Sequence, residues 1–225
     1  MPSWNIHTAQ VEQLLEEHIP SELGICDVNC FLFGNFLPDV YVGYMVPRVS
    51  KIIDYRTTHF ADPYHMPEPD YQEFWQSYAE SNRDEEGRIS DVVLGAWAHL
   101  VADHLYNHHV NELIVKQGLE YGDPLRIRKQ SDFEHFGRTL SISMTPRVTP
   151  ELIEQCRAFP QYEVAEVDVR AAVEVACEMV EITQAHHIGS TPRYSLLDAA
   201  FFARVFDEVN ATISAGLLAY AEGLL

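Results

Sequence analysis

Residues 96–109 read Ala96-Trp97-Ala98-His99-Leu100-Val101-Ala102-Asp103-His104-Leu105-Tyr106-Asn107-His108-His109. We predict that this stretch lies in a central helix over residues 90–116, started by Ser90. His99 and Asp103 are four residues apart, so their side chains project from one face about one turn apart and can reach a single ion. Their neighbours are almost all apolar, so this part of the helix should be buried. Because a buried carboxylate must be paired or bound to a cation, the pattern predicts a metal centre.

The same helix carries three further histidines. His104 and His108 form a second pair four residues apart, on another face. His109 lies roughly 80° around the helix axis from His99, so it is expected to address a neighbouring ion. The alternative for each of these three is a half-buried or solvated histidine without a ligand role.

Composition excludes several classes of partner. The formal charge is -19, with 15 Lys and Arg against 34 Asp and Glu. Broad electrostatics therefore disfavour nucleic acid and an anionic membrane surface, although a local cationic pocket, including one made by metal ions, would escape this argument. No secretory signal and no transmembrane segment are expected, and the four scattered cysteines are interpreted as reduced thiols in the cytoplasm.

The rest of the chain also favours helices. Strand signals are sparse, and we expect one all-α domain over residues 1–225, a multi-helical fold with the metal site in a cleft between helices. Residues 54–70 show no periodic pattern of apolar residues, which predicts an ordered surface loop. Residues 118–130 look turn-like. Helices are expected over residues 8–17 (with Thr8 as N-cap), 71–81, 90–116, 132–140, 150–158, 168–185 and 195–225.

Further ligands must come from other elements, because a helical domain builds a metal centre by pointing side chains from several helices into one cleft. His7 precedes the first predicted helix. Asp39 follows a break at Gly34 and Pro38 and is expected to point inward, and His59 lies in the aperiodic segment. Each of these residues alone is weak evidence for a metal site, but their order along the chain strengthens that evidence.

In the order of its candidate ligands, and in the spacing of the last three, the chain resembles the zinc-dependent phospholipase C family, whose superfamily includes single-strand-specific zinc nucleases. Ligands of that family run as an early His, an Asp, a His, and then a His-x-x-x-Asp helix with a His six residues further on. The corresponding residues here are His7, Asp39, His59, His99, Asp103 and His109. The phrases at residues 31–39 and 95–103 are similar to those of short, intracellular bacterial members. The resemblance covers roughly the first 140 residues.

The chain departs from the family pattern in two places. Trp4 is internal, whereas secreted members use an N-terminal Trp as a ligand. The family's later His and Glu, four residues apart, have no counterpart after His109, and Asp132 and His135 are the expected substitutes. The resemblance thus implies one to three zinc ions, with manganese or iron as substitutes.

The resemblance implies a phosphoric ester hydrolase in which a metal-activated water attacks phosphorus. In that reading Asp39 orients or deprotonates the water and Asp103 bridges ions. The expected substrate is a small-molecule phosphate ester or a phospholipid head group, and residues 54–70, with Tyr64, His65 and the nearby prolines, form the cleft rim. An HD-type phosphohydrolase and a ferritin-like di-iron protein are excluded, because His-Asp and Glu-x-x-His are absent. A non-catalytic helical scaffold with a structural metal site remains the alternative.

Overall fold

The central helix, α6 (Asp91–Gln117), decides the architecture of the computed structural model, which describes residues 2–64 and 66–225. Ser90 precedes it in an extended conformation, and Gly118, at a φ of 61°, ends it by donating its N–H to the Ile114 and Val115 carbonyls. Every side chain from Asp91 to Asp103 is buried. A helix that is apolar on all sides needs neighbours on all sides, and the remaining helices supply them.

The fold is all-α, as predicted: over residues 2–64 and 66–225 there are ten α-helices and no strands. Besides α6 they are α1 (Trp4–Glu17), α2 (Val28–Gly34), α3 (Leu37–Val40), α4 (Tyr55–His59), α5 (Tyr71–Phe74), α7 (Asp123–Gly137), α8 (Pro150–Arg157), α9 (Glu166–Ala185) and α10 (Ala199–Ala221). Pro20–Leu23 and Glu80–Asn82 form short 3-10 helices, and Trp75–Ala79 forms a π-helical turn. None of the helices in the described part is long and apolar enough to cross a membrane.

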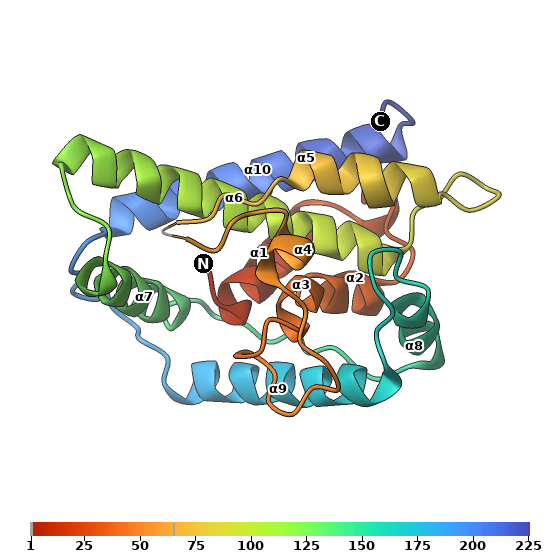
Figure 1. Ribbon diagram of the computed structural model, residues 1–225, viewed down its shortest axis with the longest axis horizontal. Helices are drawn as coiled ribbons and strands as arrows, with labels where there is room; N and C mark the ends of the chain where they lie inside the picture. Colours follow the sequence, from red (N-terminus) through yellow and green to blue (C-terminus); the bar gives the residue numbers. More distant parts are fainter. Residues whose placement is uncertain (1, 65) are drawn as a thin grey trace.

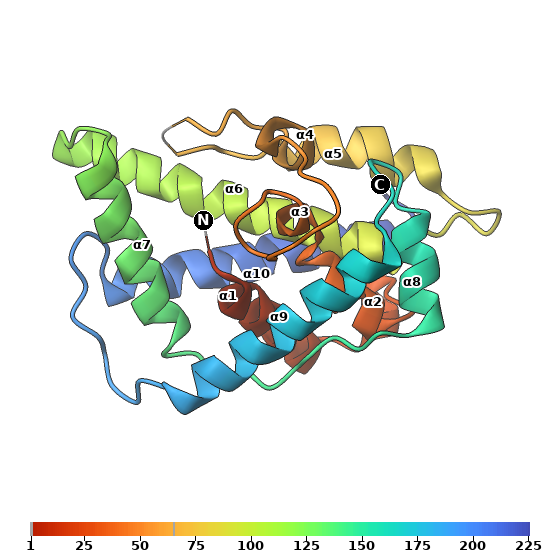
Figure 2. The ribbon, with the colours of Figure 1, turned by 60° about the horizontal axis from the view of Figure 1, so that its bottom comes forward.

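Two long antiparallel helices, α6 and α10, lie side by side along the longest axis of the molecule (Figure 1). Helix α9 runs along the opposite side, and α1 packs against both α9 and α10 (Figure 2). Helix α2 packs on α6 and α8, whereas α7 covers the other end of the molecule. Helices α2 and α3 pack directly on α6, and α1 and α4 bring the buried side chains of His7 and His59 to the same region.

Two glycines set the contact between α2 and α6. A Cβ at Gly95 would overlap the carbonyl oxygen of Phe31, and one at Gly34 would overlap that of Val92. The absence of side chains at both positions lets the two backbones touch. As a result the carbonyl of Asn35, just after α2, reaches the His99 ring on α6.

Several predicted boundaries were wrong. Helix α1 begins at Trp4, and the Thr8 hydroxyl donates to the Trp4 carbonyl inside the helix, so Thr8 is not the N-cap and His7 is helical. The segment 54–70 contains α4, because the Asp54 carboxylate accepts the Arg56 N–H and starts a helical turn.

Two further predicted boundaries also shift. Helix α7 begins at Asp123, nine residues before the predicted start at residue 132, because its burial comes from widely spaced apolar residues in a polar sequence. Helix α10 begins at Ala199, since the Asp198 side chain accepts the Phe201 N–H as a cap. The cysteines are free thiols, as expected.

Candidate metal centre

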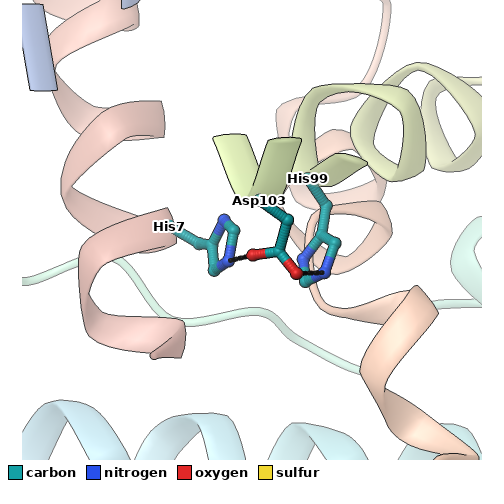
Figure 3. A group of neighbouring side chains, drawn as sticks. All are labelled: His7, His99 and Asp103. Carbon is teal, nitrogen blue, oxygen red and sulfur yellow. Dashed lines mark ion pairs between the residues drawn. The ribbon is translucent and has the colours of Figure 1, made fainter. Parts of the chain in front are cut away.

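Five of the eight predicted ligands converge in the interior. His7 comes from α1, Asp39 from α3 and His59 from the last position of α4, and α6 contributes His99 and Asp103. All five are buried, and four of them have no exposed surface at all. In Figure 3 the Asp103 carboxylate lies between the His7 and His99 rings. The predicted i,i+4 pair therefore faces the core, as the apolar flanks of the helix indicated.

The distances within the cluster are those of ligands around a shared ion. Asp103 Oδ1 lies 3.6 Å from His7 Nε2, and its Oδ2 lies 3.6 Å from His99 Nε2 and 3.7 Å from His59 Nε2. His59 Nε2 is 3.3 Å from His99 Nε2 and 3.6 Å from Asp39 Oδ1. Two ligands at ordinary zinc bond lengths on a tetrahedron are about 3.3 Å apart, whereas good hydrogen bonds in proteins are about 2.7–3.2 Å.

Neighbouring groups fix the orientation of two of the imidazoles. His99 Nδ1 lies 2.9 Å from the Asn35 carbonyl, which can only accept, so Nδ1 carries the proton and Nε2 presents a lone pair to the cluster. His59 Nδ1 lies 2.7 Å from the Thr58 hydroxyl oxygen. That hydroxyl can donate to the Tyr55 carbonyl and so can accept from Nδ1. Hydrogen bonds of this kind hold metal-binding histidines in the ligating tautomer.

The carboxylate of Asp39 is held in a similar way. Its Oδ2 accepts the indole N–H of Trp4 at 3.1 Å, which leaves Oδ1 facing His59. Trp4 itself is fully buried and stacks on Phe36. An internal Trp near the start of the chain thus orients a predicted ligand through its side chain.

Burial and neighbouring groups shift the pKa values of four of the five residues. Burial lowers the pKa of His7, and burial likewise lowers that of His59, so both rings are neutral at neutral pH. For Asp39 and Asp103 burial alone would raise the pKa. The neighbouring imidazoles outweigh burial and lower the pKa of both carboxyls. Neutral imidazoles and ionised carboxylates are the forms that bind metal.

The polar atoms of this cluster need a partner that the protein does not supply. Both ring nitrogens of His7, both oxygens of Asp103 and Oδ1 of Asp39 are buried without a hydrogen bond among the described residues. An unpaired buried polar atom costs about 1–3 kcal/mol. One of the two His7 nitrogens is an N–H in the neutral ring, so four of these atoms are acceptors that a cation could satisfy. Two overlapping sets, His7/His99/Asp103 and Asp39/His59/His99, each offer ligand atoms within 4.8 Å of one another. The arrangement therefore fits one or two ions.

A cleft reaches this cluster from the surface. It has a volume of about 820 Å3, and Asp39 is part of its lining. Pro63 and Pro67, from the segment predicted to form a cleft rim, also line it. Tyr64 is instead exposed, under the Arg56 guanidinium, and His65 lies outside the described residues.

Three basic residues line the cleft, together with the carboxylates of Asp39 and Glu134. Arg126, Lys129 and Arg138 line it from α7 and its C-terminal end. Lys129 is buried, with its ammonium 3.4 Å from Asn107 Oδ1. These cations were not identified from the sequence, because residues 118–130 looked like a turn. The signal was the i,i+3 spacing of Arg126 and Lys129, which places both on one face of a helix.

The structure does not bring the other three expected ligands into the cluster. His109 turns toward α10, where its Nε2 lies 2.9 Å from Glu208 and its Nδ1 lies 2.9 Å from Glu112. His109 was expected to address a neighbouring ion, but the described ligand sets do not include it.

Asp132 and His135 do not form a metal-binding pair. Both oxygens of Asp132 accept backbone N–H groups, from Ser195 at 2.8 Å, Leu196 at 2.7 Å and Leu197 at 2.9 Å. Asp132 therefore anchors the chain ahead of α10, which explains its burial without a metal. His135 is half-buried on α7, and its Nδ1 has no hydrogen-bond partner in the described part of the chain. Neither residue belongs to the ligand sets found there.

Comparison of the chain with protein-family models, with curated proteins and with solved structures gave no match.

Proposed function

We propose that this protein is a metal-dependent phosphoric ester hydrolase, with the ion held by His7, Asp39, His59, His99 and Asp103. One observation carries the proposal: a buried set of imidazole and carboxylate ligands meets, at Asp39, a cleft lined by cations. Three imidazoles with carboxylates suit zinc best. The resemblance in ligand order to the zinc-dependent phospholipase C family supports the same assignment.

When bound, such an ion supplies Lewis-acid chemistry, since it polarises a phosphoryl oxygen and favours ionisation of a neighbouring water. Asp39 lies where the ligand cluster and the cleft meet, and the Trp4 indole fixes its Oδ2. Its Oδ1 faces His59 without a hydrogen-bond partner, and we assign it the role of proton acceptor. Asp103 is fully buried among three imidazoles and has the role of holding the ligand set together.

The cleft explains how a chain with a net charge of -19 can take an anionic substrate. Arg126 pairs with Asp123, and Arg138 pairs with Glu134, so their charges are partly neutralised. The Lys129 ammonium has a neutral amide oxygen as its hydrogen-bond partner. Burial lowers the pKa of Lys129, and an anionic phosphoryl oxygen nearby would favour the charged form. We therefore assign Lys129 to binding the substrate phosphate.

The size and lining of the cleft indicate the substrate class. A volume of about 820 Å3 is within the range of small-molecule sites, roughly 300–1,000 Å3. Met45, Phe133 and Ile182 provide apolar walls beside the cations. A phosphodiester that carries an apolar or aromatic group fits these features, and a phospholipid head group has the same chemistry.

The test uses tag-free, zinc-loaded protein and an aryl phosphodiester. We expect slow hydrolysis that a chelator abolishes and zinc restores. Asp39→Asn should abolish turnover, and Lys129→Gln should raise KM with a smaller change in kcat. Lys116→Gln, at an exposed position near the end of α6, is the control and should match the wild type. A zinc-loaded protein inactive on phosphodiesters, phosphomonoesters and phospholipids would refute the proposal and favour a structural metal site.

A further inference from the structure

A second group of potential ligands lies near the surface, away from the buried cluster. Glu68, from the segment before α5, meets His104 and His108 on α6, and all three are half-buried. Each offers one ligand atom, and these atoms lie within 4.8 Å of one another. The two imidazoles are four residues apart on one helix face, the spacing at which two histidines reach one ion.

The imidazoles are oriented for binding. His104 Nδ1 lies 2.9 Å from the Pro69 carbonyl, so it carries the proton and Nε2 presents a lone pair. The edge of Tyr71 packs against the same ring. The rings of His104 and His108 are parallel within 4°, with centroids 5.9 Å apart, so they form one side of a common site. In the core, His99 makes the same kind of orienting hydrogen bond, in which its Nδ1–H donates to the Asn35 carbonyl.

The carboxylate is equally well positioned. Glu68 Oε2 lies 3.1 Å from His108 Nδ1, and the Asn111 amide donates to its Oε1. A second carboxylate, Glu112 Oε1, lies 3.8 Å from His108 Nε2. The site therefore offers two imidazoles and one carboxylate, with a second carboxylate at its edge. The high negative charge of the chain adds a general attraction for cations.

We propose that Glu68, His104 and His108 form an outer site for a zinc-class divalent ion. The ion would link α6 to residues 66–70. Side chains of α6 also hold this segment by donating hydrogen bonds to its backbone carbonyls. Asn107 donates to the Pro67 carbonyl at 2.6 Å, and Asn111 donates to that of Met66 at 3.2 Å. Pro67 lines the cleft, so the outer ion would clamp the rim of the cleft against the central helix. The outer site does not depend on the protein being a hydrolase.

Ion counting tests the site. Tag-free protein, stripped with a chelator, is dialysed to equilibrium against micromolar zinc, and bound zinc is measured per chain. We expect the His104→Ala/His108→Ala variant to bind about one ion fewer than the wild type. The matched control is His186→Ala/His187→Ala, which removes two exposed adjacent histidines after α9 and should bind as the wild type does. Equal zinc content in all three proteins would overturn the proposal.

A second readout locates the ion. Zinc should slow hydrogen exchange at the amides of Met66, Glu68 and Asp70 in the wild type and in the His186→Ala/His187→Ala control, because an ion at Glu68 restrains that segment. The same amides should not respond to zinc in His104→Ala/His108→Ala. Loss of protection confined to that variant supports the outer site, whereas protection that persists in it would show that Glu68 and His108 form an ion pair only.

Discussion

Replacing Asp103 with Asn separates the metal contribution to stability from packing. The side chain is fully buried, and its two oxygens face three imidazole nitrogens at 3.6–3.7 Å. Asparagine has nearly the same shape, so the variant creates no cavity. It does remove the carboxylate that lies next to all three imidazoles of the cluster. The expected defect is therefore a loss of zinc-dependent stabilisation.

The size of that defect follows from linkage. Zinc at about 1,000 times its dissociation constant stabilises the folded state by about 4 kcal/mol per ion. For a chain of 225 residues, the entropy of unfolding is about 470 cal/mol/K, so each kcal/mol moves Tm by about 2 °C. We expect zinc to raise the Tm of the parent protein by about 9 °C per ion, and to raise that of Asp103→Asn by little or nothing.

The assay is thermal unfolding followed by circular dichroism, with zinc or with chelator, in a His104→Ala/His108→Ala background that excludes the outer site. Asp168→Asn is the control, because Asp168 is also buried but its oxygens accept from Tyr41 Oη and the Ser50 N–H, each at 2.8 Å. That variant should lose stability equally with and without zinc, through weakened hydrogen bonds. The reasoning fails if Asp103→Asn keeps the full zinc-dependent rise in Tm.

Three further predictions concern the groups around the cluster. Gly95→Ala should weaken zinc binding by at least tenfold in a competition titration, because the new methyl group overlaps the Phe31 carbonyl and moves α2, with its orienting carbonyl, away from α6. Burial raises the pKa of Asp91 to about 6 from an unfolded value of 3.8, so its contribution to stability is present below the unfolded value and is lost as pH rises through the folded one. Relative to Asp91→Asn, the wild type should therefore lose about 3 kcal/mol of unfolding free energy between about pH 3.5 and 7 in denaturant titrations, and a constant difference would contradict this. Asp132→Asn should lower Tm without changing zinc content, since Asp132 binds backbone N–H groups, and a loss of zinc would restore it as a ligand.

The sequence predicts local geometry well at this site. His99 and Asp103 lie on one rigid helix, so their spacing alone places both side chains on one face, and their apolar neighbours indicate that this face is buried. The inward position of Asp39 after Pro38 was also predicted correctly. The convergence of His7 and His59 on the same point was expected only from the resemblance in ligand order. No local pattern specifies which helix covers which side of α6.

The errors share one physical origin, which is that non-local packing assigns the partners. His109 was expected to address a neighbouring ion, but its Nε2 lies against a carboxylate on α10. Asp132 was expected to be a ligand. Its actual partners are the backbone N–H groups of residues 195–197, which approach it only in the folded chain and so cannot be identified from the sequence. The outer site was missed for the same reason, because Glu68 lies in an aperiodic segment whose approach to α6 no sequence period reveals.

The central claim is that the buried imidazole and carboxylate cluster binds a transition-metal ion. Its most direct test is X-ray diffraction at the zinc absorption edge, on crystals of tag-free protein grown without chelator and with zinc. The account predicts an anomalous difference peak enclosed by the side chains of His7, His59, His99 and Asp103. Clear density for those side chains with no anomalous peak among them would contradict it.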